Sequence, residues 1–216
     1  SPAAFRRADA TSVFRPKNST IYSSHQLLDA EDRLLERSHD TTGPTVSLVT
    51  MERIARRPDS DGRVLGEDQA EALVRIAVSG RGLDVLVGPA GAGKTTAMNA
   101  LRRAWETEHG ADSVVGLAPS AGAAQVLAED LGIATENTAK WWQTHQATGS
   151  TFKAGQLVIV DEASLAGTRS LDRITGLAAE AGAKVLLVGD YAQLQSVDAG
   201  GAFGRGNEFC ALREGL

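Results

Sequence analysis

The chain has 216 residues, of which 42% are apolar and 5% aromatic, with 23 glycines and a formal net charge of −5. This length is enough for one complete domain with a buried core, and the apolar content excludes an intrinsically disordered chain. The negative charge excludes a basic field over the whole molecule, so a contact with nucleic acid would need a local patch. Abundant glycine with few aromatic residues favours an α/β protein with many tight turns.

Cysteine and histidine usage excludes several kinds of site. Cys210 is the only cysteine, which excludes an intrachain disulfide and a cysteine metal cluster. The four histidines are scattered without metal-ligand spacing. No apolar run approaches ~18 residues, and the first residues lack the apolar core of a signal peptide. We therefore expect a cytoplasmic protein, and the missing initiator methionine suggests a fragment of a longer chain.

The first 63 residues are expected to form an N-terminal extension. Residues 1–23 are polar and irregular, and a helix follows them, with Ser23 and Gln26 as its capping box. Four leucines share one face of this helix, namely Leu27, Leu28, Leu34 and Leu35. Residues 38–63 are rich in turn-forming residues, so we interpret them as a connector with one short strand at 45–49.

Strands and helices alternate from Gly66 onward. Short apolar runs predict buried strands at 83–87, 114–117, 157–160 and 185–188. Helical spacing of apolar residues predicts helices over 70–78, from 94 to about 108, over 121–131 and over 171–181. Because most of the strands are apolar on both faces, we predict an α/β fold with a mainly parallel sheet and helices on both sides.

A phosphate-binding loop lies between the first predicted strand and its helix. Residues 88–95 read Gly-Pro-Ala-Gly-Ala-Gly-Lys-Thr, which matches G-x-x-x-x-G-K-[ST]. Glycines let successive N–H groups point at phosphate oxygens, Lys94 can reach the β- and γ-phosphates, and the Thr95 hydroxyl can ligate Mg²⁺. A chance match has a probability under ~1%. The expected nucleotide contacts are Gly88, Pro89, Ala90, Gly91, Ala92, Gly93, Lys94, Thr95 and Thr96.

Two carboxylates follow the predicted strand at 157–160. Ligands of α/β sheets bind at the carboxyl ends of the strands, so Asp161 would hold Mg²⁺ and Glu162 would orient or deprotonate the attacking water. The alternative is a strand-end turn whose acids merely face solvent. Downstream of a P-loop and in the same predicted sheet, the metal and water site is the stronger interpretation.

A further polar turn follows the predicted strand at 185–188, at the same carboxyl ends of the strands. The amide of Gln193 can donate a hydrogen bond to a γ-phosphate oxygen and accept one from water. The alternative is a solvated loop glutamine. Asp190 is expected to cap the turn rather than to bind metal.

The P-loop, the Asp161-Glu-Ala-Ser segment and the Gly189-Asp-Tyr-Ala-Gln-Leu segment resemble, in this order and spacing, motifs I, II and III of superfamily 1 helicases. Within that superfamily the chain is similar to the helicase part of the MobF-class, TraA/TraI-like, conjugative relaxases of actinobacteria. The resemblance covers about residues 5–203, most specifically 66–203. It implies a RecA-type first motor domain at 64–203 that binds and hydrolyses MgATP, with Lys94, Glu162 and Gln193 as catalytic residues.

The resemblance also assigns roles outside the three motifs. Gln69 matches the adenine-reading glutamine of the family, and the alternative of a surface helix residue is about equally supported. Pro119 and Ser120 lie in a segment resembling motif Ia, which contacts single-stranded DNA. Lys140 can meet a phosphate, and one of the two tryptophans after it, Trp141 or Trp142, can stack on a base. The alternative is that both tryptophans serve packing, which is favoured for at least one of them.

The second motor domain and the relaxase nuclease domain are missing from the sequence, and residues 204–216 are atypical, so we expect a flexible tail there. We therefore predict the ATPase motor domain of a truncated helicase, with low activity in isolation, weak contact with single-stranded DNA and no unwinding. Its expected partner is the missing motor domain or another chain. The alternative is a vestigial or regulatory nucleotide-binding module, whereas a small-molecule P-loop kinase is disfavoured because an arginine-rich lid is lacking.

Overall fold

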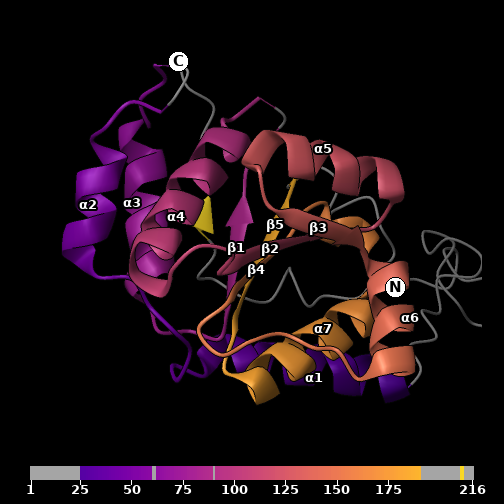
Figure 1. Cartoon of the computed structure of the whole chain (residues 1–216). Coiled ribbons are helices and arrows are strands. Elements are labelled where there is room, and N and C mark those ends of the chain that lie inside the picture. Colours follow the sequence, from indigo (N-terminus) through magenta and orange to yellow (C-terminus); the bar gives the residue numbers. More distant parts are fainter. Residues whose placement is uncertain (1–24, 60–61, 90, 191–209, 212–216) are drawn as a thin grey trace, which may run out of the picture.

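The computed structural model describes residues 25–59, 62–89, 91–190 and 210–211. These residues form a parallel sheet with the strand order β3-β2-β4-β5-β1-β6 (Figure 1). The strands are β1 Leu83–Val87, β2 Val114–Ala118, β3 Ala134–Asn137, β4 Leu157–Val160, β5 Lys184–Gly189 and β6 Cys210–Ala211. The predicted α/β fold with a parallel sheet is confirmed.

Helices cover both faces of the sheet. They are α1 His25–His39, α2 Leu48–Ala55, α3 Glu67–Val78, α4 Lys94–His109, α5 Ala121–Leu131, α6 Thr138–Thr148 and α7 Thr168–Ala181. Helices α2 to α5 lie on one face, α1 and α7 on the other, and α6 stands at the end beyond β3 (Figure 1). Leu157 and Ile159 of β4 pack with the first layer, and Val158 and Val160 with the second. No described helix has the length and apolar content needed to cross a membrane.

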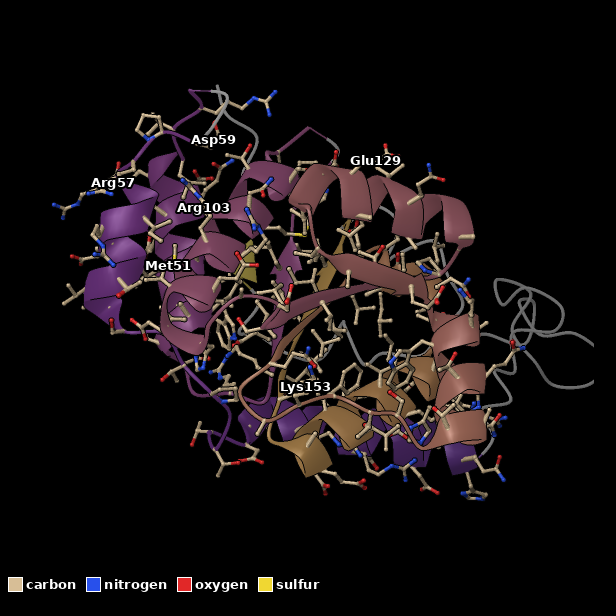
Figure 2. All side chains as sticks on the ribbon, in the orientation of Figure 1. Met51, Arg57, Asp59, Arg103, Glu129 and Lys153 are labelled. Carbon is tan, nitrogen blue, oxygen red and sulfur yellow. The ribbon has the colours of Figure 1, made fainter. Side chains whose placement is uncertain are left out.

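The strand predicted at 45–49 is wrong, because helix α2 begins inside that segment. The Ser47 hydroxyl caps α2 by accepting a hydrogen bond from the Thr50 N–H at 3.3 Å. The Glu108 carboxylate accepts one from the Ser47 N–H at 3.0 Å, and its bonds to Ser47 lower the pKa of Glu108. The fully buried Met51 then points from α2 toward α4 (Figure 2). The connector expected over 38–63 therefore contains a helix of the core.

Helix α1 confirms the predicted N-terminal helix, and of the four leucines expected on its inward face only Leu28 is exposed. Leu34 is buried, whereas Leu28 is 40% exposed. Arg33 and Arg37 both bind the Asp172 carboxylate of α7, each at 2.7 Å, and this fixes the rotation of α1. Burial raises the pKa of Asp172, but the two guanidinium hydrogen bonds outweigh it and hold that pKa below the ordinary value. Ser23 of the expected capping box lies outside the described residues.

Strands β3 and β6 were not predicted from the sequence, and each lies at an edge of the sheet. Strand β3 reads Ala-Thr-Glu-Asn and has no apolar run, since one of its sides is not covered by another strand. Strand β6 pairs in parallel with β1 at Leu86 and Val87. Its two residues belong to the 204–216 tail that was expected to be flexible, so that expectation does not hold at Cys210–Ala211.

A buried ion pair joins β5 to β1. Lys184 is fully buried, and its Nζ lies 2.6 Å from Oδ2 of Asp84, which is 7% exposed. The same ammonium donates to the Ser79 hydroxyl at 2.9 Å and to the Arg81 carbonyl at 2.8 Å. All three N–H groups of Lys184 therefore have acceptors, and the cost of burying the charge is offset locally.

We predict that Lys184→Met lowers the free energy of unfolding by about 3–5 kcal/mol, because the buried Asp84 carboxylate loses its closest cation and keeps only the Arg81 guanidinium at 3.9 Å. Urea denaturation followed by circular dichroism measures this loss. The double variant Lys184→Met/Asp84→Leu removes both charges and should recover most of the stability. A single variant as stable as the unaltered chain would contradict the role of the pair.

Candidate nucleotide and nucleic-acid site

The loops that carry the predicted motifs meet at one edge of the sheet. Because β1 to β5 are parallel, all of them end there, and we call this the carboxyl edge (Figure 1). The P-loop follows β1, the Ser120 segment follows β2, and α6 follows β3. Asp161 and Glu162 follow β4, so residues far apart in the sequence share one surface.

The P-loop has the backbone conformation that its glycines permit. Gly91 and Gly93 have φ angles of 81° and 74°, in the left-handed region that side chains disfavour. A Cβ atom on Gly93 would meet Nε2 of Gln69, so an alanine there would be both strained and crowded. Gly93 leads directly into α4, whose first N–H groups and helix dipole favour an anion. Ala90 lies outside the described residues.

Lys94 holds the loop closed with its own side chain. Its Nζ donates to the carbonyl oxygens of Gly88 at 2.6 Å and Pro89 at 2.8 Å. Phosphate oxygens are stronger acceptors for an ammonium than neutral carbonyls are, so a triphosphate can replace these bonds. Thr95 and Thr96, in the first turn of α4, are half-buried beside it.

Gln69 contacts the P-loop directly instead of facing solvent. Its Nε2 donates to the Ala92 carbonyl at 2.7 Å, and its Oε1 accepts from the Gly66 N–H at 3.0 Å. The second bond also caps the N-terminus of α3. An amide has two N–H donors and two lone pairs, so one of each remains for the edge of a base.

Asp161 stands at the end of β4, close enough to Lys94 for their charges to interact. Burial raises the pKa of Asp161, while a hydrogen bond from the Glu162 N–H at 2.9 Å and the charge of Lys94 lower it in part. A bound cation would favour the ionised carboxylate further. In the described part of the chain no three His, Cys, Asp or Glu side chains converge on a common point, so beside Asp161 and the Thr95 hydroxyl a Mg²⁺ ion would need oxygen ligands from nucleotide and water.

Glu162 adopts a strained backbone conformation next to Asp161. Its φ of 47° and ψ of 40° place a non-glycine residue in the left-handed region, and its side chain is exposed at the carboxyl edge. Gln193, the third predicted catalytic residue, lies outside the described residues. The strand that leads toward it is tied to the P-loop, because the Gly88 N–H donates to the Gly189 carbonyl at 3.2 Å.

The predicted DNA-contacting residues lie at the starts of α5 and α6. The exposed Ser120 caps α5 by accepting a hydrogen bond from the Ala123 N–H at 3.1 Å, which leaves its own O–H able to donate. Pro119 precedes it and is half-buried. Lys140, in the first turn of α6, already pairs with Glu136 at 2.8 Å, with 65% of its side chain exposed.

The two tryptophans of α6 have different surroundings. Trp141 stacks on Phe152 at 4.7 Å and packs against the core beside α7, so the packing alternative describes it. Trp142 is half-buried, and the guanidinium of Arg173 lies 4.9 Å from its ring centre. Sequence reasoning missed Arg173, because it lies far from Trp142 in the sequence and on another helix.

Comparisons with known proteins agree with this geometry. The chain is 32% identical over 185 residues to the conjugal transfer protein TraA of Rhizobium radiobacter, which covers 84% of the chain and 16% of TraA. It is 36% identical over 139 residues to a probable conjugal transfer protein TraA of Sinorhizobium fredii (strain NGR234), and this match covers 64% of the chain and 12% of that protein. The chain therefore spans less than a fifth of the curated relatives that it matches.

The fold is that of a helicase-like P-loop domain. The crystal structure of the UvsW helicase from bacteriophage T4 superposes with a TM-score of 0.53 at 15% identity, covering 74% of this chain and 68% of that one. A model of the AAA domain family matches residues 64–207, a segment that runs from α3 through the P-loop and the Asp161–Glu162 pair. On this match over most of its length, the chain belongs to the AAA domain family.

Proposed function

We propose that the chain binds and hydrolyses MgATP as the first motor domain of a DNA helicase, the helicase part of a conjugative relaxase. The observation that carries the proposal is that Asp161 follows β4 at the same carboxyl edge at which the P-loop and Lys94 follow β1. A P-loop lysine beside a strand-end carboxylate is the arrangement that places a triphosphate and its metal together. The likeness to the TraA proteins supports the link to conjugation.

Each residue of the site has a distinct task in this proposal. Lys94 leaves the carbonyls of Gly88 and Pro89 for the β- and γ-phosphates, while the loop amides bind the remaining phosphate oxygens. Thr95 and Asp161 hold Mg²⁺, directly or through water. Glu162 orients the attacking water. We further propose that Gln193 senses the γ-phosphate.

Single-stranded DNA is the second proposed ligand, and it would lie along the starts of α5 and α6. Helix N-termini favour phosphate groups, and the Ser120 hydroxyl can donate to one. Lys140 would have to exchange Glu136 for a phosphate, which makes binding weak. The alternative, a regulatory nucleotide-binding module, would bind MgATP without responding to a strand.

Hydrolysis by this chain alone is expected to be slow. The residues named above supply a metal, a water and contacts to phosphate, but none of them supplies an arginine finger, which contributes ~10³–10⁵ in rate in related enzymes. We therefore propose that a second motor domain or a partner chain completes the site, and that the chain does not unwind DNA by itself. The division at residues 63 and 203, the cytoplasmic location and the resemblance to actinobacterial relaxases remain predictions. The TraA proteins that the chain matches come from rhizobia.

We predict that Lys94→Ala weakens MgATP binding roughly 100-fold, because at least one charge-assisted contact worth on the order of 3 kcal/mol is lost. Isothermal titration calorimetry measures the affinity. The matched control is Lys153→Ala, an exposed lysine in the loop before β4 (Figure 2), which should bind as the unaltered chain does. Equal MgATP affinities of the Lys94 variant and the unaltered chain would show that the nucleotide does not bind at this loop.

The preference of the chain for adenine over guanine nucleotides tests the proposed role of Gln69 in reading the base. If its spare N–H and lone pair meet the adenine edge, the chain prefers ATP to GTP, and Gln69→Ala lowers that preference by about 1–3 kcal/mol. Calorimetry with both nucleotides measures it. Gln125→Ala, which alters an exposed glutamine bonded to Glu129, is the control that keeps the preference. An unaltered chain that binds ATP and GTP equally would contradict adenine reading.

The strained backbone of Glu162 allows stability and function to be separated. Glycine accepts a φ of 47° without the ~1–2 kcal/mol cost of a side chain, so Glu162→Gly should not destabilise the fold and should raise its melting temperature slightly. The same change should abolish ATP turnover, and so should Glu162→Gln, which keeps the shape. Calorimetric unfolding and a phosphate-release assay measure the two effects. Full turnover by either variant would exclude Glu162 as the residue that orients the water.

A further inference from the structure

Helices α6 and α7 enclose a groove of about 460 Å³ that the proposed nucleotide site does not use. The residues that matter below are Thr138, Trp142, Gln143, Gln146, Ser170 and Arg173. The groove is large enough for a small planar ligand. These residues supply an aromatic ring, a guanidinium, two amides and two hydroxyls, which together are the groups that proteins use to stack on and hydrogen-bond to bases.

Trp142 and Arg173 form the centre of the groove. The guanidinium lies 4.9 Å from the centre of the ring, and Arg173 is exposed. Arg173 forms no ion pair with the described residues, and its guanidinium contacts the Trp142 ring instead. A cation held only over an aromatic face in a solvent-exposed position is worth ~0.5–1 kcal/mol, so a better partner can displace it.

Charge distinguishes this groove from the cavity on the other side of Trp141. That cavity, of about 380 Å³, is lined by Glu106, Asp112 and Glu136, with Lys153 as its only lysine or arginine among the described residues. Its carboxylates would repel a phosphate chain. No carboxylate lines the described part of the α6–α7 groove, where Arg173 is the one charged residue. On a chain with a net charge of −5, this is a place where a polyanion can approach.

The groove begins where the proposed DNA contacts lie. Thr138 is the first residue of α6, which follows β3 at the carboxyl edge, and Ser170 lies in the first turn of α7 (α6 is at the right in Figure 1). From this opening the groove continues along both helices to Gln146 and Arg173. A strand that crosses the starts of α5 and α6 therefore arrives at the Thr138 end of the groove.

We propose that the α6–α7 groove binds a nucleotide of single-stranded DNA, as an extension of the strand contact in the proposed function, on which this inference rests. The base stacks on Trp142 in the place that the Arg173 guanidinium occupies in the free protein. The guanidinium turns to a neighbouring phosphate. The amides of Gln143 and Gln146, both exposed, meet the edge of the base with donors and acceptors, while stacking on Trp142 is open to any base.

The test measures binding of a fluorescent oligothymidylate by anisotropy over a range of salt concentrations. Trp142→Ala should weaken binding about 5- to 150-fold and leave the salt dependence unchanged, because stacking is lost and no charge is removed. Arg173→Gln should weaken binding and reduce the slope of log K against log salt by ~0.7, as expected for one phosphate contact on a single strand. The matched control is Arg169→Gln, on the same helix, whose guanidinium bonds to Gln26 of α1 and should leave binding unchanged.

Trp142→Phe keeps a stacking ring and should bind nearly as the unaltered chain does, which separates lost stacking from lost packing. A phenylalanine variant as weak as the alanine variant would overturn the proposal. So would normal binding by Trp142→Ala and Arg173→Gln while Ser120→Ala or Lys140→Gln weakens it, a result that leaves the proposed function intact. If the unaltered chain binds no strand at low salt, the groove and the strand contact both fail, and nucleotide calorimetry decides the ATP site separately.

Discussion

The parallel pairing of β1 with β5 fixes the height at which the P-loop leaves the sheet. Val87 lies opposite Gly189, and the Gly88 N–H extends the ladder by one more hydrogen bond, so the loop starts at a defined point. Strand β4 pairs with the other side of β5, with Val160 opposite Leu187, so Asp161 leaves the sheet at the same edge. At the opposite end, the buried pair of Lys184 and Asp84 holds the same two strands together. The relation of Lys94 to Asp161 depends on this register.

Protein groups occupy the positions of both proposed ligands in the free chain. Lys94 bonds to two carbonyls of its own loop. Lys140 pairs with Glu136, and Arg173 lies over Trp142. These contacts hold the side chains close to the proposed binding sites. They also satisfy the charges and hydrogen-bonding groups of these side chains while no ligand is bound. Ligand binding is then an exchange of partners, whose net free energy is smaller than the new contacts alone would give.

Sequence patterns predicted the parts of the fold that depend on local chemistry. Buried strands such as β4 are short apolar runs, and the P-loop needs glycine and lysine at fixed spacing. Helix α2 was mistaken for a strand because β-branched residues surround Ser47, whose capping bond and contact with Glu108 decide the outcome. The Lys184–Asp84 pair and the Arg173–Trp142 contact join residues distant in sequence, so no local pattern indicates them.

The central claim is that nucleotide and strand share the carboxyl edge and act on each other. Its most direct test is the steady-state rate of ATP hydrolysis by the purified chain, with and without oligothymidylate, using Glu162→Gln as the blank. We expect turnover well below the ~1–100 s⁻¹ of typical phosphoryl-transfer enzymes, with an increase when the strand is added. A rate that the strand leaves unchanged, in a chain that binds both ligands, would contradict the claim and favour a regulatory nucleotide-binding module.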